Sequence, residues 1–235
     1  MVESNAPALS PPAPRTRMIA STKKIPVVPL AVVGVLAIGL WRFPLFRVVP
    51  LTAPAAVTAG QPAAFDPIGV AAKIWQTDLP AAAARAVEFT TLASALRTDA
   101  GAARATFAKT SGLGASYFFV RGSGQVIARE HNLLRLAVDG APGETVAIRL
   151  GPVFGNTVRD GCGLLDVNSF PGLQEFNALS AELNALVEKN ILPGVRDHAK
   201  VGATVTFVGC AEAPDVAPNA GEPLLTIVPI QAEVW

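Results

Sequence analysis

The longest uninterrupted pattern in the chain is LQEFNALSAELNALVEKNIL, residues 173–192, which contains neither glycine nor proline. Its apolar residues recur at the spacing of one face of an α-helix, and we therefore predict a helix here. The dipeptide Pro193-Gly194 follows and is predicted to end it. This helix constrains the fold most, because the sequence on both sides of it changes to patterns that are typical of β-strands.

Three segments before the helix and two after it are predicted to be strands, because they are rich in β-forming residues or alternate with a period of two. A Gly-Ser-Gly sequence inside the first segment predicts a bulge or a tight bend. The order of three strands, a helix and two strands is that of an OB-like five-stranded β-barrel. The predicted fold class is therefore α+β. The five segments are residues 115–130, 132–140, 144–151, 202–212 and 222–235.

Short helices are predicted before the strands. Asp66 is placed to cap a helix that has Pro67 at its first position. Two more alanine-rich helices are predicted over 81–96 and 99–108. We expect these helices to form a layer (65–110) that precedes the barrel (115–235), with both parts in one periplasmic domain, 65–235.

The N-terminal region contains a charge-free apolar run, IPVVPLAVVGVLAIGLW, residues 25–41, which is at the short end of what spans a bilayer. We predict a transmembrane helix here, after a disordered cytoplasmic tail (1–24) and before a linker (42–64). Basic residues before the run place the N-terminus in the cytoplasm and the domain in the periplasm of a bacterial inner membrane. A cleaved signal peptide is the alternative, but the nearest small-x-small site, Ala53 to Ala55, is far from the run.

Composition excludes some classes of function. The net charge is +1 and aromatic residues are 6% of the chain, so neither the basic field nor the stacking surface of a nucleic-acid binding protein is expected. The two histidines, His131 and His198, are far apart, and we expect neither a metal site nor another cofactor. The two cysteines, Cys162 and Cys210, are predicted to form a disulfide in an exported domain, with two buried thiols as the alternative.

The turn-rich stretch GPVFGNTVRDGCGLLDVNSF, residues 151–170, contains the candidate site. In the structural interpretation, Arg159 holds the connection to the long helix by hydrogen bonds, and Asp160 closes a turn. In the functional interpretation, polar residues of this stretch line a cleft for a carbohydrate or a protein partner. Asp160 and Asp166 are also a possible acid and base pair, although their spacing does not select them. The candidate binding residues are Arg159, Asp160, Asn156, Asp166 and Asn168.

Several segments together resemble the domain-of-unknown-function family 2291. They are FDP with IW soon after, FVRGSGQV, GPVFGNTVRDG, FPGLQEFNALSAELN, VGATVTFVGCAE and IVPIQAEV, in this order from Phe65 to the C-terminus. The resemblance implies a periplasmic lipoprotein of a kind commonly encoded beside sugar ABC importers. No cysteine precedes Cys162, so we expect the apolar run to replace the lipid anchor.

These observations predict a non-enzymatic, membrane-anchored periplasmic accessory or binding protein. Its expected partners are the inner membrane, through residues 25–41, and components of a sugar ABC importer. The alternative is a periplasmic enzyme that acts on a carbohydrate. No catalytic constellation stands out in the sequence, and this favours the first hypothesis.

Overall fold

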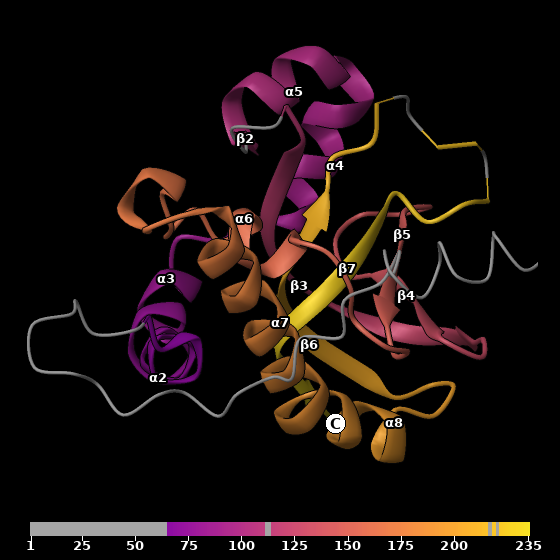
Figure 1. Ribbon diagram of the computed structural model, residues 1–235. Helices are drawn as coiled ribbons and strands as arrows, with labels where there is room; N and C mark the ends of the chain where they lie inside the picture. The colour runs from indigo at the N-terminus through magenta and orange to yellow at the C-terminus, as the bar shows by residue number, and fades with distance from the viewer. Residues whose placement is uncertain (1–64, 111–113, 216–217, 220) are drawn as a thin grey trace, which may run out of the picture. The chain divides into compact units, whose positions relative to one another are not determined.

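The computed structural model describes residues 65–110, 114–215, 218–219 and 221–235 (Figure 1). The predicted tail, transmembrane helix and linker, residues 1–24, 25–41 and 42–64, lie outside the described residues. Among the helices that are described, none is long and apolar enough to cross a membrane.

The helical part begins as predicted. The side chain of Asp66 accepts a hydrogen bond from the Gly69 N–H at 3.1 Å and caps the first described helix, which has Pro67 at its start. This helix continues through a π-helical turn into a third short segment. The three are α2 (Pro67–Lys73), η1 (Ile74–Asp78) and α3 (Leu79–Ala83).

The single helix predicted over 81–96 is wrong. The chain leaves the helical conformation after Ala83, forms the short strand β1 (Val87–Glu88), and begins α4 (Phe89–Thr98). The break brings Phe89 into the core, where it is fully buried. The third predicted helix is present as α5 (Ala100–Phe107), with Asp99 as its cap.

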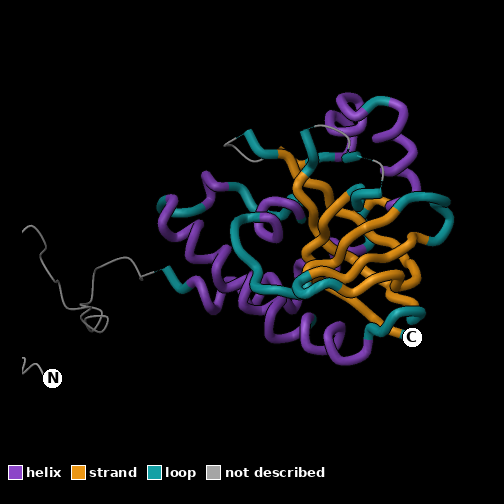
Figure 2. The backbone as a smooth tube through the Cα atoms, turned by 90° about the vertical axis from the view of Figure 1, so that its right-hand side faces the viewer, coloured by secondary structure: helices purple, strands orange, loops and turns teal. Residues whose placement is uncertain are grey.

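Five long strands form a ring. Adjacent strands pair as β3–β4, β4–β5, β5–β7, β7–β6 and β6–β3, so the last pairing returns to the first strand. Within the ring the pairings are antiparallel except β5–β7. Two short strands attach to β3, β1 in parallel and β2 (Lys109–Thr110) in antiparallel orientation. The α+β class is therefore confirmed (Figure 2). The five strands are β3 (Ser116–Arg129), β4 (Leu133–Val138), β5 (Thr145–Arg149), β6 (Thr204–Glu212) and β7 (Leu225–Val234).

The Gly-Ser-Gly sequence does not interrupt its strand. β3 continues through it, and the irregularity in its pairing with β4 lies further on, between Val126 and Ala128. Gly124 instead allows β3 and β4 to approach closely, because a Cβ atom there would lie 2.4 Å from the Ala137 carbonyl oxygen. The bulge predicted at Gly-Ser-Gly is therefore displaced toward the end of the strand.

The long helix is present as α7 (Leu173–Asn190) and lies between the third and fourth strands of the ring in chain order. Pro193 and Gly194 do not end the helical region, since both belong to the next helix, α8 (Leu192–His198). Proline is tolerated in the first turn of a helix, where its missing N–H costs no hydrogen bond. The long helix therefore ends at Asn190, close to the predicted position, but Pro193 and Gly194 belong to the next helix instead of forming a non-helical stop.

Two cores stabilise the domain. One lies inside the ring and includes Phe89 and Leu92 of α4 together with inward-facing residues of the strands, such as Phe118 and Phe207. The other lies where the outer faces of β3, β6 and β7 meet the helices, and it includes Phe119, Cys210, Val228, Leu179 and Leu183. Figure 1 shows α2 and α3 beside α7, with α4 and α5 at another end of the ring. The strands β3, β6 and β7 are therefore buried on both faces where the helices cover them.

Candidate binding site

The stretch 151–170 connects β5 to α7 and contains two short helical segments. They are α6 (Thr157–Gly161) and the 3₁₀ turn η2 (Val167–Ser169). α6 packs against α7 and β6. Pockets open on different sides of this stretch, and its residues contribute to their walls.

Arg159 is the central side chain of the stretch and is only 2% exposed. Its Nε and one terminal nitrogen donate to the two carboxylate oxygens of Asp160, at 2.7 and 3.0 Å. The other terminal nitrogen donates to the Phe176 carbonyl at 3.3 Å and to Asn177 Oδ1 at 3.0 Å. The guanidinium also lies 3.7 Å from the centroid of the Phe176 ring. Arg159 therefore fixes α6 to the first turns of α7.

The five predicted site residues do not meet in one cleft. Asp160, Asp166 and Asn168 line a pocket of about 430 Å³, in which Asp166 Oδ1 accepts hydrogen bonds from the backbone and side-chain amides of Asn168, both at 2.9 Å. Asn156 lines a different pocket. Arg159 lines neither, because it is buried between them.

The pocket that contains Asn156 lies between residues 153–156 and α7 and has a volume of about 410 Å³. We call it the α7 pocket. Phe154 is one of its lining residues and is 80% exposed, which is unusual for a phenylalanine. The helix contributes a row of polar side chains along one face. They are Asn177, Ser180, Asn184 and Glu188.

Hydrogen bonds within the protein fix the orientation of three of these side chains and leave one polar atom of each free. Asn177 Oδ1 accepts from Arg159 at 3.0 Å, so its Nδ2 remains as a donor. Asn184 Nδ2 donates to the Gly155 carbonyl at 2.9 Å, so its Oδ1 remains as an acceptor. Glu188 Oε1 accepts from the Val153 N–H at 2.7 Å, which leaves Oε2. The helical rise spreads these groups over about 16 Å.

Sequence reasoning found Asn156 but missed the rest of the α7 pocket. Asn177, Ser180, Asn184 and Glu188 follow one another at intervals of 3, 4 and 4 residues, which places them on one helix face. That spacing is a usable signal. The sequence does not show, however, that residues 153–156 fold back over this face of the helix.

The predicted disulfide is wrong. Cys162 and Cys210 are both free, buried thiols. The Cys162 Sγ turns back toward the carbonyl oxygen of Arg159, at 3.5 Å. Gly161, not Cys162, packs against Cys210, since a Cβ atom at Gly161 would lie 2.6 Å from the Cys210 Cβ. The alternative given from the sequence, two buried thiols, is confirmed.

Without any reductant, we expect the unfolded protein to show two reactive thiols. The native protein should react only slowly with a thiol reagent at pH 8. Burial raises the pKa of both Cys162 and Cys210, which lowers the fraction of reactive thiolate in the folded state. Titration with DTNB before and after addition of guanidinium chloride measures both states. Thiols that appear only after a reductant is added would show that a disulfide forms.

The protein is a mixed α+β protein, with a ring of five strands and a helix between the third and fourth, and its fold is similar to that of an OB-fold protein. The crystal structure of an OB-fold protein from Thermotoga maritima MSB8 aligns with 73% of this chain and 99% of its own chain, at 19% sequence identity and a TM-score of 0.60. No protein in the curated set matches the chain. The family model described as "Predicted periplasmic lipoprotein (DUF2291)" matches residues 32–233. The chain belongs to this family, as the resemblance of its motifs predicts.

Proposed function

We propose that this protein is a membrane-anchored periplasmic binding protein whose α7 pocket holds a neutral saccharide, in the service of sugar import. The family description supports a periplasmic location. The apolar run 25–41 supports an inner-membrane anchor, and the resemblance to proteins encoded beside sugar importers supports a sugar as ligand. We further infer that the ring of strands is an OB-like barrel that serves as the scaffold for this pocket.

The observation that carries the proposal is the exposed residue Phe154 in the lining of the same pocket as a row of amide, hydroxyl and carboxylate groups. A saccharide ring has an apolar face of C–H groups and an edge of hydroxyls that donate and accept. An exposed aromatic side chain suits the face, and the free groups of Asn184 and Glu188, four residues apart on α7, have the spacing of hydroxyls on one edge. The volume of about 410 Å³ lies within the range of small-molecule sites.

Charge favours a neutral ligand over an anionic one. Among the described residues, Glu188 is the one charged residue in the lining of the α7 pocket, and no lysine, arginine or histidine lines it. A carboxylate or phosphate on the ligand would lose its water there without gaining a cation. We therefore expect neutral sugars to bind better than their acidic derivatives at this pocket.

The alternative function, an enzyme that acts on a carbohydrate, has one observation in its favour. Asp160 and Asp166 line the same pocket of about 430 Å³ and would be its acid and base. However, both oxygens of Asp160 already accept hydrogen bonds from Arg159. Proton transfer to Asp160 would break this buried pair, so the geometry supports binding better than catalysis.

Replacing Phe154 with alanine should weaken saccharide binding by about tenfold or more, because truncation of an aromatic anchor commonly costs over 1 kcal/mol. Thermal shifts with D-glucose, D-xylose, D-ribose and maltose select the probe, and calorimetry of the full-length protein in detergent measures the affinity. Since Phe154 is exposed, the melting temperature of the variant should not change.

Leu173→Ala is the matched control, because Leu173 is 60% exposed and does not line the α7 pocket. It should bind the selected saccharide like the unmodified protein. Binding that survives Phe154→Ala, or that is lost equally in both variants, would reject the α7 pocket as the site. Release of reducing sugar from maltose would support the enzymatic alternative.

A further inference from the structure

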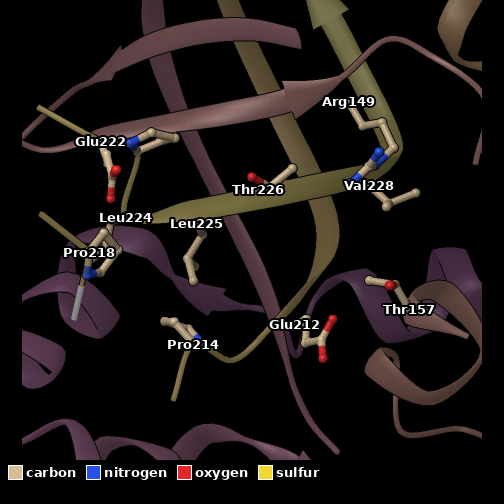
Figure 3. A pocket seen from close by; sticks show the side chains of 11 residues that line it. Arg149, Thr157, Glu212, Pro214, Pro218, Glu222, Leu224, Leu225, Thr226 and Val228 are labelled. Carbon is tan, nitrogen blue, oxygen red and sulfur yellow. The ribbon is translucent and has the colours of Figure 1, made fainter. Parts of the chain in front are cut away.

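A second and larger pocket lies where β6 and β7 separate. The pairing of these strands ends at Ala211 and Ile227, and a pocket of about 600 Å³ opens beyond this point. Figure 3 shows Thr226 on β7 within this pocket, with Glu212 at one side of it and Arg149 at another. We call it the β7 pocket. It shares no lining residue with the α7 pocket.

Arg149 is the cation of the β7 pocket. It is the last residue of β5, it is partly exposed, and it forms no ion pair within the part of the chain that the structure describes. Of the other strand arginines, Arg121 pairs with Glu88 and Arg135 with Glu130, while Arg129 donates a hydrogen bond to the Arg196 carbonyl oxygen. A planar guanidinium without a partner in a pocket is suited to bind a carboxylate through two parallel hydrogen bonds.

Two glutamates also line the β7 pocket, and they limit which acids it can accept. Glu222 is engaged with its own loop, since its Oε2 accepts hydrogen bonds from the backbone and side-chain amides of Asn219 at 3.1 and 3.3 Å. Glu212 is exposed at the end of β6 and is left to accept hydrogen bonds from a ligand. A simple carboxylate would be repelled by Glu212, whereas an acid that also carries hydroxyl groups satisfies both residues.

We propose that the β7 pocket binds a hydroxylated carboxylic acid, such as a sugar acid. Arg149 holds the carboxylate, Glu212 accepts hydrogen bonds from the hydroxyls, and Thr226 adds a further hydroxyl contact. The apolar side chains of Leu225 and Val228 pack against the carbon skeleton of the ligand. This site is independent of the proposed function of the α7 pocket, because its ligand and its lining residues differ and because it contains a cation, Arg149.

Calorimetric titration of the full-length protein with D-glucuronate and D-glucose tests the proposal, because the two probes differ only in a carboxylate that replaces a hydroxymethyl group. We expect Arg149→Gln to weaken D-glucuronate binding by about tenfold or more, the cost of a lost charge-assisted contact. Glu212→Gln should also weaken it, and neither change should alter the binding of D-glucose. D-Gluconate serves as a second probe of the same class.

Arg129→Gln is the matched control, because it removes the same charge from an exposed arginine that does not line the β7 pocket. It should leave D-glucuronate binding unchanged, and so should Phe154→Ala, which tests the other pocket. The proposal is overturned if neither acid binds. It is equally overturned if Arg149→Gln and Glu212→Gln, checked to melt like the parent, both bind D-glucuronate with unchanged affinity.

Discussion

Arg159→Ala should lower the free energy of unfolding by about 3–5 kcal/mol, because it removes one partner of a buried ion pair. The side chains of Arg159 and Asp160 are 2% and 6% exposed, so the variant would leave the Asp160 carboxylate buried without its cation. The same change removes the hydrogen bonds to the Phe176 carbonyl and to Asn177. Equilibrium unfolding in urea, followed by circular dichroism, measures the loss.

Two further variants separate this effect from a general loss of charge. Arg159→Lys should recover little stability, because an ammonium cannot reproduce the planar fork. Arg121→Ala breaks an ion pair with Glu88 whose side chains are 42% and 51% exposed, and we expect it to cost less than about 1 kcal/mol. If Arg159→Ala unfolds like the parent but no longer binds saccharide, Arg159 is a ligand-binding residue and its structural role is rejected.

Gly161→Ala should lower the free energy of unfolding by roughly 1–3 kcal/mol, the usual cost of overpacking a core. The added Cβ would lie 2.6 Å from the Cβ of Cys210 and 2.9 Å from its Sγ. Gly161 ends α6, so relief of this clash would move α6 away from β6. Thermal and urea unfolding of the variant would show the loss.

Gly194→Ala is the control for the effect of a methyl group on helix stability. Gly194 lies inside α8, and an added Cβ would meet no heavy atom within 4 Å. Because alanine favours a helix over glycine by up to about 1 kcal/mol, this variant should be as stable as the parent or more stable. If the Gly161→Ala variant is also as stable as the parent, α6 does not pack closely against β6.

The order of the strands and the long helix could be predicted because their hydrophobic periods differ and persist over many residues. The break after Ala83 was not, because the segment 81–96 is rich in alanine and contains no glycine or proline to mark a break. Burial of Phe89 inside the ring of strands overrides that local preference. The helical role of Pro193 and Gly194 was missed for a related reason, since α8 restarts the helix at a proline that local rules assign to a terminus.

Part of the candidate site could likewise be predicted from the sequence, and part could not. The structural role of Arg159 followed from its chemistry, because a single arginine in a glycine-rich connection needs acceptors close by. The α7 pocket depends on contacts between residues 153–156 and helix positions more than 20 residues further along the chain, as in the bonds from Asn184 to Gly155 and from Val153 to Glu188. Sequence spacing identifies the polar face of the helix but not the segment that covers it.

Hydrogen exchange followed by mass spectrometry tests the central claim most directly, on the full-length protein with and without a saturating concentration of the saccharide selected by thermal shift. Residues 153–156, which border the α7 pocket together with Asn177, Asn184 and Glu188, should exchange more slowly when the saccharide is bound. The Phe154→Ala variant should lose this protection. Protection that appears elsewhere in the domain and leaves residues 153–156 unchanged would contradict saccharide binding at the α7 pocket.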